Sequence, residues 1–248
     1  MCREVNHHLE QMAQAIFKSW FVDFEPFGGT MPDEWRAGSF SEVISTTLSG
    51  DWGKDVPFGN NSQEVYCIRG ADIPDVNVGN KGKMPIRFIL TKNYTSKRLT
   101  VGDVVVEISG GSPTQSTGRC ALITQSLLDR YDRGMVCTNF CRAIKPSEGY
   151  SAFAYFYWKY LYDQNVMFSY ENGTTGIKNL DITGFLENEP IIIPPIDVVA
   201  QFAKAVDTFV DAIFANGLEN EGLATTRDTL LPRLMSGELS IADLGDAK

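Results

Sequence analysis

Two glycine-rich segments of the chain carry side chains that could bind a polar or anionic ligand. Residues 107–119 (EISGGSPTQSTGR) and residues 170–179 (YENGTTGIKN) combine glycine with hydroxyl, amide and basic side chains. Glycine lets backbone N–H groups approach a phosphate closely, and the polar side chains suit phosphate oxygens or base edges. Alternatively, both segments are ordinary turns whose hydroxyl groups bond their own backbone. The sequence leaves both interpretations open.

A stretch without acidic residues precedes the first of these segments. Residues 76–102 contain Lys81, Lys83, Arg87, Lys92, Lys97 and Arg98. The formal net charge of −9 argues against a simple nucleic-acid binder, but residues 32–190 carry a net charge of only −2 and the acidity lies at the two ends. A local basic stretch can contact a polyanion whatever the global sign. The alternative is a solvated surface loop.

Motifs for catalysis are missing from the sequence. It has no GxGxxG that opens a helix after a strand and no GxxxxGK[ST]. Its one Pro-Pro pair, at 194–195, lacks the polar and aromatic flanks of an adenine methyltransferase motif. Both histidines, His7 and His8, lie outside the middle of the chain, so no Ser-His or Cys-His pair is expected there. Carboxylate pairs such as Asp72/Asp75 are expected to be surface groups, and we predict a protein that is not an enzyme.

The cysteines predict neither a metal site nor disulfides. Cys2, Cys67, Cys120, Cys137 and Cys141 form no CxxC pair, and the histidines are remote from Cys137 and Cys141. We therefore expect buried free thiols, no metal and no cofactor. No apolar run approaches the roughly 20 residues that span a bilayer, and the first residues lack the apolar stretch of a signal peptide. The expected location is the cytoplasm.

Amphipathic helices are predicted at both ends. In the first, over residues 5–24, Leu9, Met12, Ile16 and Trp20 share one face, which Phe17, Phe21 and Phe24 widen. The second begins near Ile196 and follows a heptad seam of about five repeats, the spacing of a coiled coil. The seam consists of Val199, Phe202, Val206, Phe209, Ile213, Asn216, Asn220, Leu223, Arg227, Leu230 and Leu234. An alternative is that this helix breaks near Gly217.

Short strands and one buried helix are predicted between these ends. Residues 65–68, 104–108, 140–144 and 191–193 are strand candidates, and the aromatic run 151–163 predicts a buried helix. Trp35 is expected to fill a core. The fold class is therefore α+β: one globular α/β domain with a mixed or antiparallel sheet, flanked by a short N-terminal helix and a long C-terminal coiled-coil helix. The expected division is 1–25, 31–195, 196–237 and a tail, 238–248.

Five segments, in this order, resemble the C-terminal half of a type I restriction-modification specificity subunit. Residues 9–26 are similar to the end of that family's central helix, and MPDEWR at 31–36 resembles its "LPxGW" segment. GDVVVEISGGS at 102–112 resembles "GDxLxxxxGS". KNLDI at 178–182, PIIIPPI at 190–196 and Gln201 resemble the segment "hLxxxxLxxxxIPLPPLxEQ". RDTLLPRLMSGEL at 227–239 is similar to the close of the second conserved helix.

The resemblance implies a non-catalytic subunit with a target-recognition domain that reads one half of a split double-stranded DNA site. It also implies docking of methyltransferase and restriction subunits on the helices. Full members carry two recognition domains, whereas this chain shows one, so a homodimer joined through the helices could supply the second. Alternatively, the short helix packs on the long one within a single chain. Other readings are a coiled-coil interaction protein that does not bind DNA and an inactive recombination cassette of a specificity locus.

The candidate residues follow from the segments and the resemblance together. Phosphate contacts are expected from Lys81, Lys83, Lys92, Lys97 and Arg98. Base-edge or close backbone contacts are expected from Ser109, Gly110, Ser112, Thr114, Gln115, Thr117, Arg119, Asn172, Thr174, Thr175, Lys178 and Asn179. Partner contacts are expected from Met12, Ile16, Trp20, Phe202, Val206, Phe209, Ile213, Leu230 and Leu234.

Overall fold

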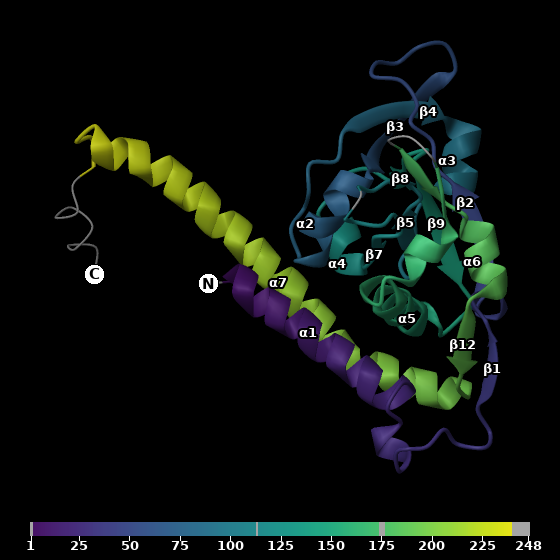
Figure 1. Ribbon diagram of the computed structural model, residues 1–248. Helices are drawn as coiled ribbons and strands as arrows, with labels where there is room; N and C mark the ends of the chain where they lie inside the picture. Colours follow the sequence, from purple (N-terminus) through teal and green to yellow (C-terminus); the bar gives the residue numbers. More distant parts are fainter. Residues whose placement is uncertain (1, 113, 174–176, 240–248) are drawn as a thin grey trace.

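A pair of antiparallel helices runs along one flank of a globular α/β domain in the computed structural model, which describes residues 2–112, 114–173 and 177–239 (Figure 1). The first helix, α1, spans Cys2–Phe21, and the last, α7, spans Ile196–Met235. Asn6 near the start of α1 lies beside Ile213, whereas Phe21 at its end packs on Phe202 near the start of α7. The start of α1 therefore lies about midway along α7, whose far half extends beyond it.

Aromatic rings fill the contact between the two helices. Phe17 and Phe21 meet the ring of Phe202 edge-on, with centroid distances of 5.8 and 5.0 Å. All three side chains are fully buried or nearly so. Such edge-to-face pairs stabilise by about 0.5–1.5 kcal/mol each beyond the burial of their area. The short helix therefore packs on the long one within the chain, which was one of the two arrangements left open by the sequence.

The buried face of α1 is rotated from the predicted one. Ala13, Phe17 and Phe21 form its centre, whereas Met12 is 52% exposed and Trp20 is half-buried. The stripe predicted around Met12 was wrong because α1 contacts two elements at once. Phe17 touches Phe202 of α7 on one side and Tyr157 of α5 (Ser151–Asp163) on the other. The helix also ends at Phe21 rather than residue 24, since Phe24 adopts a left-handed conformation, with φ at 55°.

Helix α7 continues without a break through both of its interior glycines. A Cβ at Gly217 would lie 1.9 Å from the carbonyl oxygen of Gly79, so glycine there permits a close approach to the globular domain. A Cβ at Gly222 would meet nothing within 4 Å. Beyond this point several apolar side chains are uncovered: Leu223 is 57% exposed and Met235 81%. The alternative of a helix break near Gly217 is therefore wrong.

Among the described residues, the strands of the globular domain form four small sheets. The largest is antiparallel, in the order β2 (Ile44–Ser49), β9 (Cys141–Pro146), β5 (Val104–Glu107) and β7 (Cys120–Leu122). A mixed sheet has the order β4 (Ile86–Leu90), β3 (Asn61–Ile68) and β8 (Met135–Cys137), with β3 and β8 parallel. A third sheet joins β10 (Glu171–Asn172), β11 (Lys178–Leu180) and β6 (Ser109–Gly110). The predicted α+β fold class is confirmed.

The fourth sheet joins the two ends of the domain. Strand β1 (Arg36–Ser39) pairs antiparallel with β12 (Pro190–Ile193). The short helices that complete the domain are α2 (Ile73–Asn77), α3 (Thr91–Lys97), α4 (Gln125–Leu128) and α6 (Ile182–Asn188), with 3-10 turns η1 (Glu25–Phe27), η2 (Phe40–Glu42), η3 (Gly70–Asp72) and η4 (Val166–Tyr170). The domain thus leaves and rejoins the helix pair at one place.

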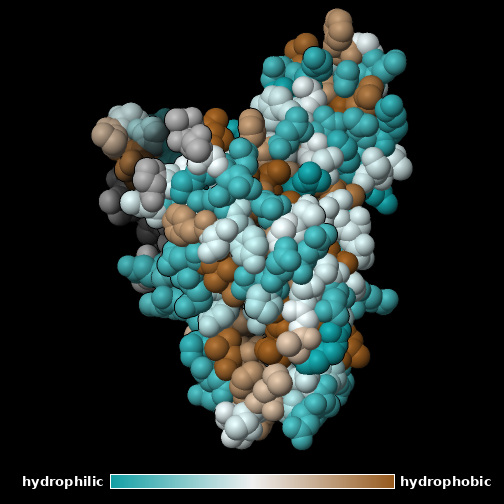
Figure 2. All heavy atoms as spheres, turned by 45° about the vertical axis from the view of Figure 1, so that its right-hand side comes forward, coloured by the Kyte–Doolittle hydropathy of each residue, from teal (hydrophilic) through white to brown (hydrophobic). Residues whose placement is uncertain are grey.

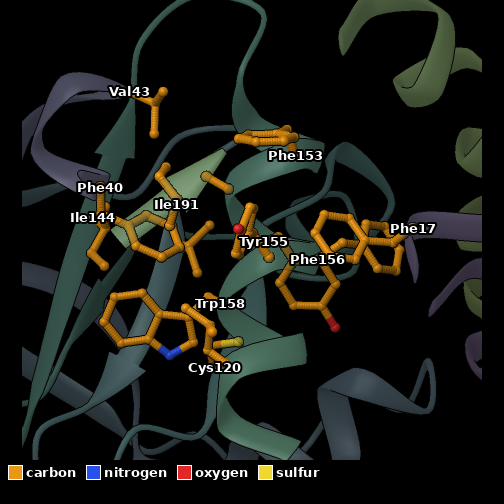
Figure 3. Packing of buried hydrophobic residues seen from close by; sticks show 14 of the residues in the cluster. Phe17, Phe40, Val43, Cys120, Ile144, Phe153, Tyr155, Phe156, Trp158 and Ile191 are labelled. Carbon is orange, nitrogen blue, oxygen red and sulfur yellow. The ribbon is translucent and has the colours of Figure 1, made fainter. Parts of the chain in front are cut away.

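The aromatic helix α5 forms the centre of the core, with the bounds predicted from the sequence. Figure 3 shows Trp158 beside Phe40 and Ile144, and Phe156 turned toward Phe17. The indole nitrogen of Trp158 donates to the backbone oxygen of Gly118 at 2.8 Å, so its one polar atom is satisfied inside the core. Trp35 is 3% exposed and packs on Phe27 with centroids 4.8 Å apart, which confirms its predicted burial.

The cysteines whose side chains are described are buried free thiols. Burial raises the pKa of Cys120 and of Cys137 to about 12 and that of Cys141 to about 11, so these sulfurs stay protonated and unreactive at neutral pH. Within the described residues, no group of three or more His, Cys, Asp or Glu is placed to hold a metal ion. In the same part of the chain, no helix combines the length and apolar character needed to cross a bilayer.

Candidate nucleic-acid interface

The two glycine-rich segments come together in space. Strand β6, from the first, pairs antiparallel with β11, from the second, so that Ser109 lies opposite Asn179 and Gly110 opposite Lys178. Strand β10 continues the sheet through β11. The sequence predicted each segment separately, and the structure places both in one small sheet at the surface. Their exposed polar side chains therefore belong to a single site.

Glu171 fixes the two segments to each other. Its Oε1 accepts from the backbone N–H of Thr117 at 2.6 Å and from the Thr117 hydroxyl at 3.0 Å, and its Oε2 pairs with Lys178 Nζ at 2.7 Å. Burial by itself would raise the pKa of Glu171, but the bonds from Lys178 and Thr117 outweigh it and hold the pKa below its usual value. The carboxylate therefore stays ionised and anchors the loop.

Arg119 is held by a second buried carboxylate. Its Nε and one terminal nitrogen each donate to Glu107 at 2.8 Å, a bidentate pair in which the Glu107 side chain is 8% exposed. The hydrogen bonds from Arg119 to Glu107 raise the pKa of the guanidinium despite partial burial. Thr117 is fully buried. Arg119 and Thr117, both predicted to reach DNA, thus use their polar atoms to hold the segment in place.

The exposed tip of the first segment is a tight turn. The hydroxyl of Ser112 accepts from the backbone N–H groups of Thr114 and Gln115 at 3.3 and 3.0 Å, and the backbone N–H of Ser112 donates to Gln115 O at 2.7 Å. These hydrogen bonds within the segment are the ones expected of an ordinary turn, while the Thr114 and Gln115 side chains remain exposed. Asn172 and Asn179 are likewise exposed. Thr174 and Thr175 lie outside the described residues.

The predicted basic residues divide into two groups. Lys81 and Lys83 lie before β4 on the side facing α7, whereas Lys92, Lys97 and Arg98 lie on or just after α3. Lys83, Lys92 and Arg98 are exposed. By contrast, Lys97 Nζ donates to Gly50 O at 3.0 Å, and Lys81 Nζ lies 4.8 Å from the ring centre of Tyr131.

Arg87, in the middle of the same basic stretch, is not a surface charge. Its side chain is 6% exposed, and its guanidinium lies 4.0 Å from the ring centre of Trp52. Its Nε donates to the backbone oxygen of Trp52 at 2.8 Å. The stretch is therefore less basic at the surface than the sequence indicates.

A cleft of about 500 Å³ borders the sheet β10–β11–β6 and includes residues that the sequence did not single out. Ser109 and Glu107 line it, together with Trp52, Arg69, Asn139 and Phe140. Phe140 is 62% exposed although it follows β8 and directly precedes β9. An aromatic residue at a strand end predicts burial, so the sequence carried no sign of this exposed ring.

The predicted partner residues fall into two environments. Phe202, Val206 and Ile213 are buried within the chain, with Ile16, Trp20 and Phe209 partly buried against the same core. Leu230 and Leu234 are half-buried on the far part of α7, and Met12 is exposed. Of these predicted partner residues, only Met12, Leu230 and Leu234 lie outside the contact between α1 and α7.

The fold of this chain, a paired-helix frame that carries one α/β domain, matches about half of each of two solved type I specificity subunits. The HsdS subunit from Thermoanaerobacter tengcongensis matches with a TM-score of 0.51 at 16% identity, over 96% of this chain and 53% of that one. The type I restriction-modification S subunit from M. genitalium matches with a TM-score of 0.55 at 16% identity, over 94% and 55%. These likenesses show a shared fold.

Two curated relatives agree with the fold. The chain is 25% identical over 271 residues to the MjaIX specificity subunit of Methanocaldococcus jannaschii, covering 98% of this chain and 55% of the relative. It is 24% identical over 294 residues to the HindI specificity subunit of Haemophilus influenzae, covering 95% and 63%. No protein-family model matches. The resemblance to type I restriction enzyme specificity subunits is confirmed, and the chain spans little more than half the length of these relatives.

Proposed function

We propose that this chain is a DNA-reading specificity subunit, or half-subunit, of a type I restriction-modification complex. The observation that carries the proposal is the union of two glycine-rich segments in the sheet β10–β11–β6, on a domain whose fold matches such subunits. Exposed amide and hydroxyl groups on a fixed backbone are suited to read base edges. The role proposed is recognition rather than catalysis, and the chemistry on DNA belongs to partner subunits.

Different residues have different proposed roles at this site. Thr114, Gln115, Asn172 and Asn179 contact base edges, with Lys178 beside them. A second group binds phosphates and consists of Lys83, Lys92 and Arg98, with Lys81 and Lys97 at the margin. Arg119 and Thr117 act through the backbone that they hold, and Ser109, Gly110 and Ser112 offer close backbone or hydroxyl contacts.

Selection from a random duplex library tests the proposal. The purified chain, alone and co-expressed with the methyltransferase subunit of the same system, is expected to enrich one short half-site. Asn179→Ala should lower affinity for that half-site by about 5- to 150-fold, since a good bidentate base contact contributes about 1–3 kcal/mol, while random DNA is affected little. Asn188→Ala, an exposed asparagine on α6, is the matched control. A library that stays unenriched in both preparations would refute the proposal.

Surfaces for protein partners remain on the helix frame. The far part of α7 exposes Leu223, Leu231 and Met235. Figure 2 shows hydrophobic residues at the lower end of the molecule, in the region of η1 and the start of α7, where Met31 and Ile196 are exposed. We infer that these surfaces dock methyltransferase and restriction subunits or a second copy of the chain. Light scattering at micromolar concentration tests the homodimer, and a strictly monomeric species would exclude it.

A further inference from the structure

The cleft beside β6 has two aromatic walls. Trp52 is 38% exposed and Phe140 62%, and both line the hollow. Its volume of about 500 Å³ falls within the range of small-ligand sites, about 300–1,000 Å³. Exposed aromatic side chains of this size are costly to leave in water, so a pair of them on one cleft indicates a ligand with apolar faces.

Both rings are presented on fixed backbone. The carbonyl oxygen of Phe140 accepts from the backbone N–H groups of Ile108 and Ser109 at 2.9 and 3.3 Å, and the N–H of Phe140 donates to Thr138 Oγ1 at 3.3 Å. Trp52 is held by Arg87, whose Nε donates to the Trp52 backbone oxygen at 2.8 Å and whose guanidinium lies over one face of the ring at 4.0 Å. Since the surrounding backbone is already ordered, a ligand that stacks on these rings pays little additional entropy.

Polar groups complete the cleft. Arg69 is held on the buried Asp72 by two hydrogen bonds of 2.9 and 3.0 Å, and its Nη2 also donates to Lys83 O at 2.7 Å. Glu107, whose two oxygens accept from Arg119, forms part of the wall, and Asn139 adds an exposed amide. The absence of a side chain at Gly70 leaves room for Glu107, since a Cβ there would lie 2.4 Å from Glu107 Oε1. Apolar faces with donors and acceptors at one edge are the complement of a planar heterocycle.

We propose that this cleft binds a single nucleobase of the bound DNA, displaced from the helical stack. This inference rests on the proposed function. Ser109 lines the cleft and also lies opposite Asn179 in the sheet proposed to read DNA, so the two sites are continuous. Within a duplex both faces of a base are covered by its neighbours, so a base can stack on Phe140 or Trp52 only after it leaves the stack.

Mismatch scanning of the selected half-site tests the inference. A mismatched base leaves the stack more easily than a paired one, so a mismatch at the extruded position should strengthen binding several-fold. Phe140→Ala should abolish this gain and weaken binding of the matched duplex by about 5- to 150-fold, the range found for loss of an aromatic that stacks on a base. Phe58→Ala is the matched control, since Phe58 is 71% exposed and lies outside the cleft. Circular dichroism checks that both variants fold.

The outcomes separate this inference from the proposed function. If the half-site is selected but no mismatch strengthens binding, or if Phe140→Ala behaves like Phe58→Ala, the cleft proposal is overturned while DNA recognition stands. If no half-site is selected, the proposed function fails first. Adenosine, guanosine, cytidine and thymidine are also titrated by NMR. Binding of a free nucleoside without any mismatch effect would assign the cleft to a free nucleotide and overturn the DNA form of the proposal.

Discussion

The side-chain amide of Asn216 in α7 donates to Oδ1 of Asn6 in α1 at 2.8 Å, so a polar side chain on each helix has its hydrogen-bond partner on the other helix. The amide of Asn6 also donates to Val78 O and Ile213 O at 2.9 and 3.0 Å. One buried side chain thereby joins both helices to the globular domain. A single asparagine pair in an apolar helix contact fixes the register, because any slip leaves both amides unpaired.

Asn6→Ala should lower the free energy of unfolding by about 2–3 kcal/mol. The substitution removes the partner of Asn216, of the buried Ile213 carbonyl and of the partly buried Val78 carbonyl, and each unsatisfied buried group costs about 1–3 kcal/mol. Urea denaturation followed by circular dichroism measures the change. Gln11→Ala, at an exposed position of the same helix, should stay within about 0.5 kcal/mol of the unmodified protein. Equal stabilities for the two variants would contradict the network.

The two glycines inside α7 should respond to alanine with opposite signs. Gly222→Ala should stabilise by about 1 kcal/mol, since alanine is the better helix former and the site is open. Gly217→Ala should destabilise by about 1–3 kcal/mol, because its Cβ would overlap the carbonyl oxygen of Gly79. Thermal and urea unfolding of both variants measures the difference. A stabilising Gly217→Ala would show that the helix does not approach Gly79 closely.

Glu171 should make part of the free energy of unfolding depend on pH in the acid range. The pKa of Glu171 is lower in the folded protein than its ordinary value of 4.5, so its contribution is present above that value and lost as pH falls through the folded pKa. Urea unfolding of the unmodified protein and of Glu171→Gln is compared between pH 3 and 7. The stability difference should be constant above about pH 5.5, where the unfolded carboxyl is ionised, and shrink below about pH 4. A difference that does not vary with pH would exclude an ionised anchor.

Arg119→Ala should act first on the fold. The substitution leaves Glu107 buried without its partner, and removing one member of a buried ion pair costs about 3–5 kcal/mol. Because the Arg119 side chain is 25% exposed, we expect a loss at the lower end of this range or below it. The double variant Arg119→Ala/Glu107→Gln should recover part of the loss, because the uncompensated charge is gone. Chemical denaturation gives both values. Wild-type stability in Arg119→Ala, with affinity lost on the selected half-site alone, would instead favour direct base contact.

Lys92→Ala should weaken binding to every duplex and reduce the salt dependence of the affinity. Loss of one phosphate contact lowers the slope of log affinity against log salt by about 1. Fluorescence anisotropy between 50 and 200 mM salt measures it. Lys204→Ala removes the same charge from an exposed position of α7 and should leave the slope unchanged. If both variants share one slope, Lys92 does not belong to the phosphate-binding group.

Local patterns predicted the elements of this fold better than their contacts. The aromatic run of α5 and the start of α7 at Ile196 have the predicted bounds, because helical period and flanking prolines are readable within a few turns. The rotated face of α1 was not readable, since it depends on Tyr157 and Phe202 from elements far along the chain.

The candidate site was predicted in part. Both glycine-rich segments were identified, but the pairing of Ser109 with Asn179 joins residues too far apart for any local pattern. Arg119 and Thr117 were predicted to contact DNA, because a sequence cannot show that they form hydrogen bonds to Glu107 and Glu171. The exposure of Phe140 depends on tertiary packing and was missed for the same reason.

The pairing of β1 with β12 has a consequence for how this protein can diverge. Because Arg36 lies opposite Ile193, the domain between them begins and ends on two adjacent strands. Insertions or deletions in surface loops within that interval leave the separation of its two ends unchanged. Surface positions of the domain that lie away from its contacts with the helices at Val78, Gly79 and Tyr157 can therefore change without disturbing the helix frame.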